Sequence, residues 1–280
     1  MPKPILSIIV LSYNTAAITV NCLKSILKDK GLKSLAYEII VIDNASTDDS
    51  ISKINSLDIK NLTQVVNKKN LGFAQGNNQA AKLAQGNYLL FLNSDTIILH
   101  SSISQTLDWL ASHPESSACT GQLLNPDHSL QPTGGYFPNL LNTLAWYLHL
   151  DDLPGFNQLI LPLHPHPPQF YTRDRFYLFN RQLDWITAAF FLIRRSHFQA
   201  LNGFSRHYFM YGEEVELCYR LKARFPQTQI WYLIGPQIIH LANASSSPAN
   251  ALAKERAGIV SFFRLHRPNW QYRLINFLLG

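Results

Sequence analysis

Short apolar runs alternate with amphipathic segments through the first 100 residues of the chain. Three of these runs are rich in leucine and β-branched residues: ILSIIVL at 5–11, YEIIVID at 37–43 and YLLFLNSD at 88–95. Continuous apolar runs of this kind are typical of strands that are buried on both faces of a sheet. A shorter strand is expected around Thr63 to Val66. Together the runs predict the strands of one central sheet.

The segments between these strands have the periodicity of amphipathic helices. Helices are predicted at 15–28, at about 76–85 and at about 101–112. In the segment NASTDDS, Ser46 or Thr47 can cap a further helix that has Asp48 and Asp49 in its first turn. Strand and helix therefore alternate, which predicts right-handed crossovers, a mostly parallel Rossmann-like sheet and an α/β fold.

The pattern changes after residue 120. Residues 121–182 are rich in proline, aromatic and leucine residues, which indicates an insertion or lid rather than another strand–helix unit. The segment WITAAFFLIRR at 185–195 predicts a core strand, and 229–247 predicts short strands that end in a serine-rich loop. We therefore expect a main domain at 1–248 and an amphipathic tail at 249–280. The main domain is expected to consist of a first half at 1–100, the insertion, and a second half at 183–248.

The composition is that of a folded protein. Of the 280 residues 46% are hydrophobic and only 15% are charged, which allows one large domain or two small ones and excludes a disordered chain. The net charge of +6 favours an anionic partner, although a solvated basic surface explains it equally well. A nucleic-acid binder is not expected, because the aromatic and basic signatures of such modules are missing.

The three cysteines, Cys22, Cys119 and Cys218, are odd in number and far apart, so we expect them to pack in the core of a protein from a reducing cytosol. No apolar run is long enough for a transmembrane helix, and the first apolar run is interpreted as a strand rather than a signal peptide. The aromatic stretch at 136–163 and the basic tail from about 254 leave two interpretations open. They either lie on an anionic membrane as peripheral elements or pack as a lid and part of the core.

Polar residues follow the predicted strands where those strands end. Asn14, Asp43 and Asp95 are expected on one rim of the sheet, where open α/β sheets bind their ligands. Asp43 can accept a hydrogen bond from a nucleobase or a ribose hydroxyl, or it can simply close a turn. Asp95 is a hard oxygen ligand suited to Mg²⁺ or Mn²⁺ on a diphosphate. His240 follows another apolar run, where it is either structural or faces a ligand.

The segment NLGFAQGNN at 70–78 places Gly72 and Gly76 among asparagines before a helix. Glycine permits a close backbone approach, and a helix N-terminus favours a phosphate. The spacing fits neither a Walker A loop nor a GxGxxG motif, so a plain turn into a helix stays open.

The segment FMYGEEVELCYR at 209–220 places three glutamates at the start of a helix expected to begin near Gly212. Helical phase puts Glu214 on the inward face, and Glu216 and Arg220 are expected to form a surface pair. A poorly hydrated carboxylate such as Glu214 is either a general base or a capping-turn acid.

Seven segments, taken in order, carry a family resemblance: SIIVLSYN, VIDNASTDDS, NLGFAQGNN, FLNSD, WITAAFFLIRR, LNGFSRHYFMYGEEVELCYRLK and IIHLANASS. They resemble the family 2 glycosyltransferases with the GT-A fold, especially the rhamnosyltransferase-like branch. The resemblance spans residues 5 to about 247. It implies an inverting transfer of a sugar, such as rhamnose from a dTDP donor, to a hydroxyl of a glycan or lipid-linked acceptor in cell-surface polysaccharide synthesis.

The resemblance also implies roles for individual residues. The nucleotide-binding set is Ser12, Asn14, Asp43, Asn44, Asn70, Gly72, Asn77, Asn93 and Ser94. The metal set, for Mg²⁺ or Mn²⁺, is Asp95 and His240, and the sugar and acceptor set is Trp185, Thr187, Ala188 and Tyr211. The base is Glu214, with Glu213 in reserve. The enzyme is expected in the cytoplasm, either free or at the inner face of the cell membrane.

Three positions depart from the pattern of the family. Asn93 stands where an acid opens the metal motif, Ala188 and Ala189 stand where Gly-Ala is common, and Glu214 stands where an aspartate is usual. These departures keep a second hypothesis open, a catalytically degenerate protein that binds a nucleotide sugar or scaffolds a complex.

Overall fold

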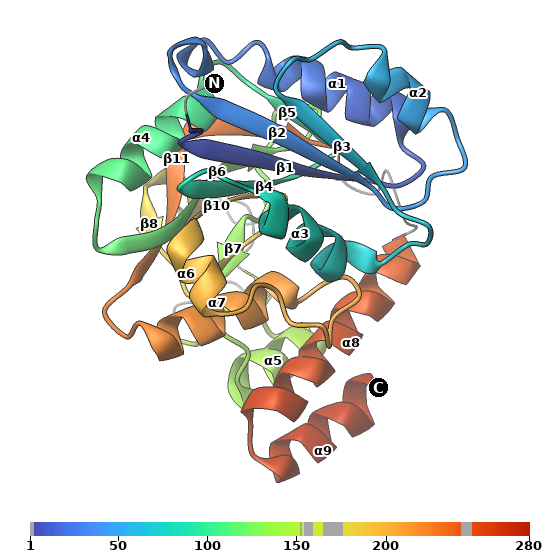
Figure 1. Cartoon of the computed structure of the whole chain (residues 1–280). Helices are drawn as coiled ribbons and strands as arrows, with labels where there is room; N and C mark the ends of the chain where they lie inside the picture. The colour runs from blue at the N-terminus through green and yellow to red at the C-terminus, as the bar shows by residue number, and fades with distance from the viewer. Residues whose placement is uncertain (1–2, 152, 154–158, 165–175, 242–247) are drawn as a thin grey trace.

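The structure is a computed structural model, and it describes residues 3–151, 153, 159–164, 176–241 and 248–280. A curled mixed sheet fills one half of the molecule, and helices α5, α8 and α9 form the opposite end, where the C-terminus lies (Figure 1). The strand order is β3-β2-β1-β4-β10-β6-β11-β5, and β8 pairs with β11. A separate two-stranded sheet joins β7 and β9.

The first half of the chain builds a parallel sheet, as predicted. Its strands are β1 (Leu6–Ser12), β2 (Tyr37–Asp43), β3 (Leu62–Val66) and β4 (Tyr88–Asn93), followed by the short β5 (Thr96–Ile98). Its helices are α1 (Ala16–Ile26), α2 (Ser50–Asn55), α3 (Gly72–Leu83) and α4 (Ser102–Ser112). β1 pairs in parallel with both β2 and β4, so the carboxyl ends of these three strands share one edge.

The second half adds antiparallel strands and the remaining helices. Its strands are β6 (Ser116–Leu124), β7 (Gly134–Gly135), β8 (Arg181–Gln182), β9 (Trp185–Ile186), β10 (Phe190–Arg194) and β11 (Gln229–His240). Its α-helices are α5 (Leu140–Tyr147), α6 (Arg195–Ala200), α7 (Glu213–Arg224), α8 (Pro248–His266) and α9 (Asn269–Leu279). β10 lies antiparallel between β4 and β6, and β11 pairs in parallel with β6.

Several predicted boundaries are wrong. The segment predicted to begin the insertion lies partly in β6, a fully buried strand through Leu124. The single strand predicted at 185–195 is two strands in different sheets, and the short strands predicted at 229–247 form one long strand, β11, with 242–247 outside the described residues. α2 begins at Ser50 after Asp49, so Ser46 and Thr47 do not cap it.

The sheet is covered on both faces by apolar side chains. Helices α1 and α4 pack on one face, where Ile8, Val10 and Leu107 are buried together. Helices α3, α6 and α7 pack on the other, around Phe91 and Leu217. All three cysteines are buried, as predicted, and burial raises the pKa of Cys22 and of Cys218 to about 12, which leaves inert thiols.

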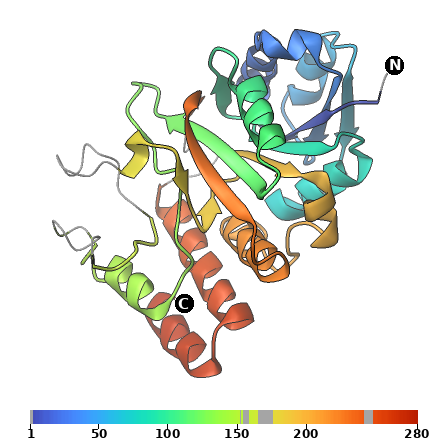
Figure 2. The ribbon, with the colours of Figure 1, turned by 90° about the vertical axis from the view of Figure 1, so that its left-hand side faces the viewer.

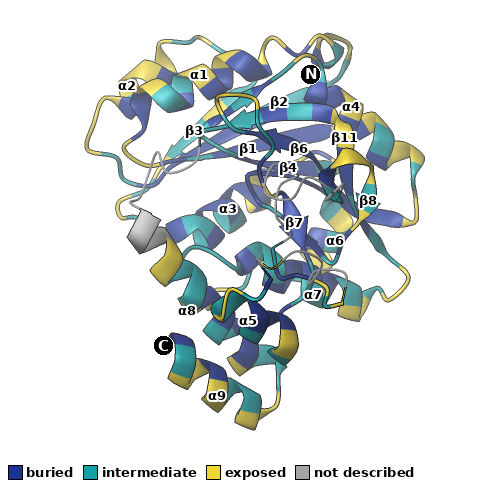
Figure 3. Ribbon diagram, turned by 180° about the vertical axis from the view of Figure 1, so that it is seen from behind, coloured by how far each residue is buried: buried dark blue, intermediate teal, exposed yellow. Residues whose placement is uncertain are grey.

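A third apolar cluster holds the tail against the rest of the chain. Phe262 and Phe263 of α8 and Ile275 of α9 pack with Leu163 of the insertion. Figure 2 shows α5 beside the hairpin of α8 and α9, away from the sheet. The inner faces of the aromatic stretch and of the tail are thus core, while yellow outer faces of α5 and α9 are exposed (Figure 3). No helix within the described ranges is long and apolar enough to cross a bilayer.

Candidate functional site at the carboxyl edge of the sheet

The strand-end residues meet at one edge, as expected. Ser12 is in register with Asp43, and Leu11 is in register with Asn93. Asp43 is buried, and its Oδ1 accepts a hydrogen bond from the Ser46 amide at 2.8 Å. Its Oδ2 is also buried and makes no hydrogen bond to any residue that the structure describes. A buried carboxylate oxygen without a donor is poised to receive one from a ligand.

Asn14 joins the loops that follow β1 and β2. Its backbone is left-handed, with φ of 52°, and its Oδ1 accepts a hydrogen bond from the Thr47 amide at 2.7 Å. The backbone N–H of Asn14 in turn donates to Ser46 Oγ at 2.8 Å. These bonds fix the two loops that flank Asp43.

Asn44, Asn70 and Gly72 fix the loop before α3. Asn44 Nδ2 donates to the Gly72 carbonyl at 3.1 Å, and Asn70 Oδ1 accepts from the Gly72 amide at 2.8 Å. Gly72 has φ of +76°, and a Cβ at this position would lie 2.5 Å from the Phe209 carbonyl oxygen. The Phe73 amide donates to the same carbonyl at 2.7 Å. The glycine therefore allows the loop before α3 to touch the loop before α7.

Other members of the predicted nucleotide set face inward. Ser12 Oγ lies 3.1 Å from Thr19 Oγ1, and Asn77 Nδ2 donates to the Phe73 carbonyl at 3.0 Å. Both residues are buried. Ser94 Oγ lies 3.5 Å from Thr15 Oγ1. These side chains hold neighbouring elements in place.

Asp95 and His240 are brought together by the pairing of β5 with β11, in which His240 is in register with Thr96. His240 Nε2 lies 3.3 Å from Asp95 Oδ1 and 3.4 Å from Asn93 Nδ2. The backbone N–H of Asn93 donates to the Ala189 carbonyl at 3.0 Å. The three residues come from two distant segments of the chain and form one polar cluster.

Gln131 sets the orientation of the His240 ring. Gln131 Oε1 lies 3.0 Å from His240 Nδ1, while Gln131 Nε2 donates to the His240 carbonyl and to Asn125 Oδ1, both at 2.7 Å. Because Nε2 already faces two acceptors, Oε1 is the acceptor for Nδ1–H. The neutral ring therefore keeps the lone pair on Nε2, which faces Asp95.

The residues present fit a divalent cation. A carboxylate oxygen and an imidazole nitrogen at 3.3 Å can occupy adjacent positions on one small ion. Among the described residues no third histidine, cysteine, aspartate or glutamate joins them. The remaining ligand positions would therefore fall to water and to oxygen atoms of a bound diphosphate.

Two glutamates begin α7. Gly212 precedes them with φ of +89°, a conformation that glycine adopts without strain. Glu213 is buried and Glu214 is half-buried. The Oε2 atom of each is shielded from solvent and has no hydrogen-bond partner in the described part of the chain. Leu217, Cys218 and Leu221 are buried on the inner face of α7.

The two carboxyl groups differ in how readily they ionise. Burial and the adjacent charge of Glu214 raise the pKa of Glu213 well above its usual value. Burial also raises the pKa of Glu214, against the smaller lowering effect of nearby His164. Because Glu213 is more completely buried, ionisation costs less at Glu214 than at Glu213. Two carboxyl groups, each with a raised pKa, are thus held side by side.

The prediction for Glu216 is wrong in one respect. It does bind Arg220, with Nε at 2.8 and 2.9 Å from its two oxygens, but Glu216 is only 3% exposed. His266 of α8 also lies within 3.2 Å of Glu216 Oε1. The pair is therefore internal, because α8 covers the side of α7 that the sequence pattern predicted to face solvent.

The predicted sugar and acceptor residues lie near α7. Trp185 is buried, donates from Nε1 to the Tyr136 carbonyl at 3.1 Å, and meets the His164 ring edge-on at 5.2 Å. Ala188 is buried, and half-buried Thr187 donates its amide to the Thr133 carbonyl at 2.9 Å. Tyr211, with φ of 71°, precedes Gly212.

His164 also pairs with Glu255 of α8 at 2.7 Å. This contact joins the insertion to the tail beside Glu214, whose pKa both groups affect. Sequence reasoning missed His164, Glu255 and Gln131. Nothing in their local sequence marks them, because long-range folding creates their contacts.

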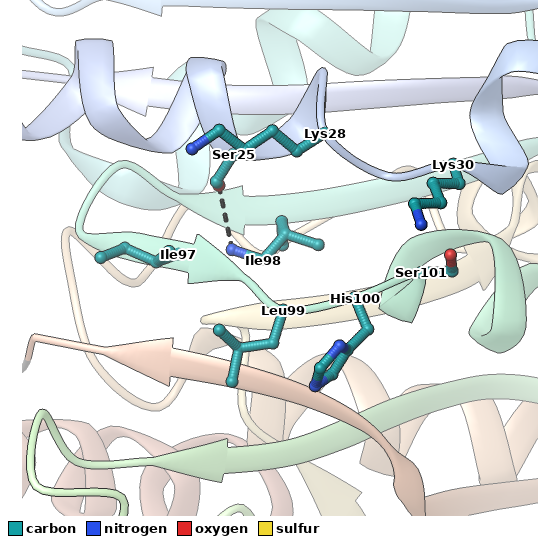
Figure 4. A pocket seen from close by; sticks show the side chains of 8 residues that line it. All are labelled: Ser25, Lys28, Lys30, Ile97, Ile98, Leu99, His100 and Ser101. Atoms are coloured by element: carbon teal, nitrogen blue, oxygen red, sulfur yellow. Dashed lines mark hydrogen bonds between the residues drawn. The ribbon is translucent and has the colours of Figure 1, made fainter.

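A hollow of about 390 Å³ lies away from this edge (Figure 4). It is lined by Lys28, Lys30 and residues 97–101, and Ser25 Oγ accepts the Ile98 amide there at 2.9 Å. It contains none of the predicted site residues, so the strand-end cluster stays the candidate site.

Comparison with known proteins identifies the family. The model of Glycosyl transferase family 2 matches residues 7–211. The N-acetylglucosaminyl-diphospho-decaprenol L-rhamnosyltransferase of Mycobacterium tuberculosis is 25% identical over 257 residues, which cover 85% of this chain and 79% of that protein. Rhamnosyltransferase WbbL of Escherichia coli is 26% identical over 240 residues, 79% of each chain.

A solved structure agrees on the fold. Mannosyltransferase PcManGT from Pyrobaculum calidifontis, in complex with GDP-Man and Mn²⁺, superposes with a TM-score of 0.62 at 14% identity, over 99% of this chain and 69% of that one. The GT-A fold and the similarity to rhamnosyltransferases that the sequence motifs implied are both confirmed. The chain is therefore a glycosyltransferase and belongs to glycosyl transferase family 2.

Proposed function

We propose that this glycosyltransferase moves a sugar from a nucleoside diphosphate donor, with dTDP-rhamnose as first candidate, to a hydroxyl of a lipid-linked saccharide. Two relatives similar over most of the chain are rhamnosyltransferases, and the name of one specifies a diphospho-decaprenol acceptor. The observation that carries the proposal is the meeting of Asp95 and His240 at 3.3 Å on the carboxyl edge of the sheet. That is where a diphosphate would need a cation.

The donor would bind across the strand-end loops. The free Oδ2 of buried Asp43 would accept a hydrogen bond from the nucleobase or ribose. The loops joined by Asn14 and Gly72 would form the walls of the nucleotide site. Asp95 and His240 would hold Mg²⁺ or Mn²⁺, which when bound offsets charge on the leaving diphosphate.

The transfer needs one base and one displacement. Glu214 would take the proton of the acceptor hydroxyl, whose oxygen attacks the anomeric carbon from the face opposite the diphosphate. The new C–O bond forms as the bond to the diphosphate oxygen breaks, and the electron pair leaves with the diphosphate. The anomeric centre is inverted, and no covalent enzyme intermediate is needed.

The direct test is a transfer assay with the full chain. The protein is incubated with Mn²⁺ or Mg²⁺, a lipid-diphosphate saccharide and a panel of donors that includes dTDP-rhamnose, and sugar transfer and release of nucleoside diphosphate are measured. We expect metal-dependent transfer from one donor. Nucleotide binding without transfer or donor hydrolysis across the panel would instead support a degenerate binding protein.

A further inference from the structure

Helix α9 has two apolar faces. Its inner face, with Ile275 and Leu279, is buried against α8. Its outer face carries Trp270, Leu274 and Phe277, which are 60%, 37% and 83% exposed. These three positions are spaced i, i+4 and i+7, so they form one stripe along the helix. Packing on α8 explains the inner face but not the outer one.

The stripe is basic as well as apolar. Arg273 is exposed and lies three residues after Trp270 and four before Phe277, so it shares the same side of α9. Residues 256–280 contain no aspartate or glutamate. Arg273 lies on α9, Arg256 and Arg264 lie on α8, and Arg267 donates to the Pro138 carbonyl. Exposed tryptophan, phenylalanine and leucine beside an arginine, on a helix without acids, are typical of a helix that lies in a lipid headgroup region.

The apolar exposure is concentrated at this end of the molecule. Of the large apolar side chains that are exposed in the described part of the chain, five belong to 136–163 and three to α9. On α5, next to the α8–α9 hairpin, Leu141 is exposed, and Leu148 is exposed directly after the helix. Scattered single exposed residues need no explanation, but a cluster of them indicates an interaction surface.

We propose that the outer face of α9, defined by Trp270, Arg273, Leu274 and Phe277, docks the enzyme onto an anionic membrane surface. The acid-free basic composition favours anionic lipid over a second copy of this chain, which carries the same excess of positive charge. The proposal that α9 docks on a membrane is argued only from the residues of this face. The proposal that docking brings the site to a lipid-linked acceptor rests on the proposed function.

The face is rigidly connected to the candidate site. α8 touches the loop before Glu213, because Gly258 lies against Tyr211 and Gly212. From Gly258 to His266, α8 extends about 12 Å at the rise of an α-helix, and α9 follows directly. A membrane that holds α9 would therefore also hold the first turn of α7 at a fixed height above it.

Vesicle flotation of the full chain tests the proposal without donor or acceptor. Vesicles of phosphatidylcholine mixed with phosphatidylglycerol are compared with vesicles of phosphatidylcholine alone. We expect binding to the anionic vesicles that weakens with salt. Trp270→Ser, Leu274→Ser and Phe277→Ser together should weaken it about tenfold or more, and Arg273→Gln alone about fivefold.

The matched control carries Leu27→Ser and Leu83→Ser, which are also exposed apolar positions but lie directly after α1 and at the end of α3. It should float like the wild type, and thermal melts should show that all variants are folded. No flotation of the wild type, or equal flotation of the stripe variant, overturns the proposal. So does sedimentation showing a dimer that the stripe variant abolishes, without vesicle binding. Transfer to a water-soluble acceptor analogue is measured separately, so failure of docking and failure of the proposed reaction are distinguishable.

Discussion

Gln131 Oε1 lies 3.0 Å from Nδ1 of His240, and this contact leaves Nε2 of the same ring directed at Asp95. Gln131 is buried and donates from Nε2 to two further acceptors, so its amide has one orientation. The glutamine is not itself a candidate ligand. It acts through the histidine, by fixing which ring nitrogen is free.

Gln131→Leu is therefore expected to weaken Mn²⁺ binding by about 10- to 100-fold, the usual cost of losing an outer partner of a histidine ligand. The measurement is calorimetric titration of Mn²⁺ into the protein with dTDP or UDP present. Gln131→Glu keeps the acceptor for Nδ1–H and should restore part of the affinity. Gln122→Leu removes a buried glutamine that binds Tyr232 and should lower stability without changing Mn²⁺ affinity. Equal Mn²⁺ affinity in Gln131→Leu and the wild type contradicts the positioning role.

The two glutamates of α7 should respond differently to the same substitution. Glu214→Gln is expected to lower kcat by about 100- to 10,000-fold, because the general base is lost, and to leave nucleotide affinity unchanged. Glu213→Gln replaces a group whose pKa burial raises well above its usual value, so kcat of this variant should fall less than about tenfold. Steady-state kinetics with calorimetry separates the two effects. A larger loss of kcat in Glu213→Gln than in Glu214→Gln would assign the role of base to Glu213.

The pH dependence of transfer follows from the same site. Burial raises the pKa of Glu214, and a base must be ionised to act. The rate should therefore fall as the pH decreases through the pKa of Glu214, which lies above the usual range of a glutamate. The rate should reach its maximum at pH values above that pKa. The profile of kcat/KM for the wild type measures this value. A profile that stays flat down to the ordinary pKa of glutamate contradicts a buried base.

The sequence predicts the first half of the fold well because its strands are buried on both faces. The run YEIIVID coincides with β2, since a continuous apolar run between polar turns has one strand interpretation. The second half is harder. β9 and β10 form one apolar run in the sequence, and only their pairing with β7 and with β4 separates them. α3 begins at Gly72, earlier than expected, and Gly72 lies against Phe209, a contact that no local pattern reveals.

The candidate site shows the same division. Asp43 ends β2, Asp95 lies in the turn after β4, and the acids of α7 begin a helix, so their positions follow from the chain pattern. The burial of Glu216 does not follow from that pattern, because the residue is covered by α8, which comes from the far end of the sequence. Gln131 reaches His240 from a loop that follows β6, a contact created only by the folded sheet.

The Glu216–Arg220 pair, in which Glu216 is buried and Arg220 is partly buried, should contribute more stability than an exposed pair of the same spacing. Glu216→Gln is expected to lower the free energy of unfolding by about 3 kcal/mol, because Arg220 and His266 lose a buried partner. Asp49→Asn is the matched control, since Lys53 and Asp49 form an exposed i,i+4 pair at 2.7 Å. That change should cost less than about 0.5 kcal/mol. Urea denaturation measures both, and equal effects would mean that α8 does not shield the first pair.

The Glu216 pair should also make stability depend on acid. Burial raises the pKa of Glu216, but hydrogen bonds from His266 and Arg220 outweigh it and hold the pKa below its usual value. A lowered pKa in the folded state gives stability that is present above the ordinary glutamate pKa and is lost as pH falls through the lowered one. Urea denaturation between neutral and acidic pH should show this loss in the wild type and less of it in Glu216→Gln. The same acid dependence in both proteins would assign the loss to other carboxylates.

Gly258 should be essential to the geometry of the site although it is far from the strand ends in sequence. A Cβ there would lie 2.6 Å from the carbonyl oxygen of Tyr211, a backbone atom that cannot rotate away. Gly258→Ala must therefore shift α8 or the loop that ends at Gly212, and with it the first turn of α7. We expect kcat to fall by about tenfold or more. The free energy of unfolding should fall by about 1–3 kcal/mol, despite the better helix propensity of alanine.

Gly235→Ala is the control for Gly258→Ala, because an added Cβ at Gly235 meets nothing within 4 Å. It should leave both kcat and the melting temperature close to those of the wild type. If Gly258→Ala were as active and as stable as this control, the contact between α8 and the loop before α7 would have room for a methyl group. The tail would then be separable from the chemistry at Glu214, and the rigid connection between α9 and the site would not hold.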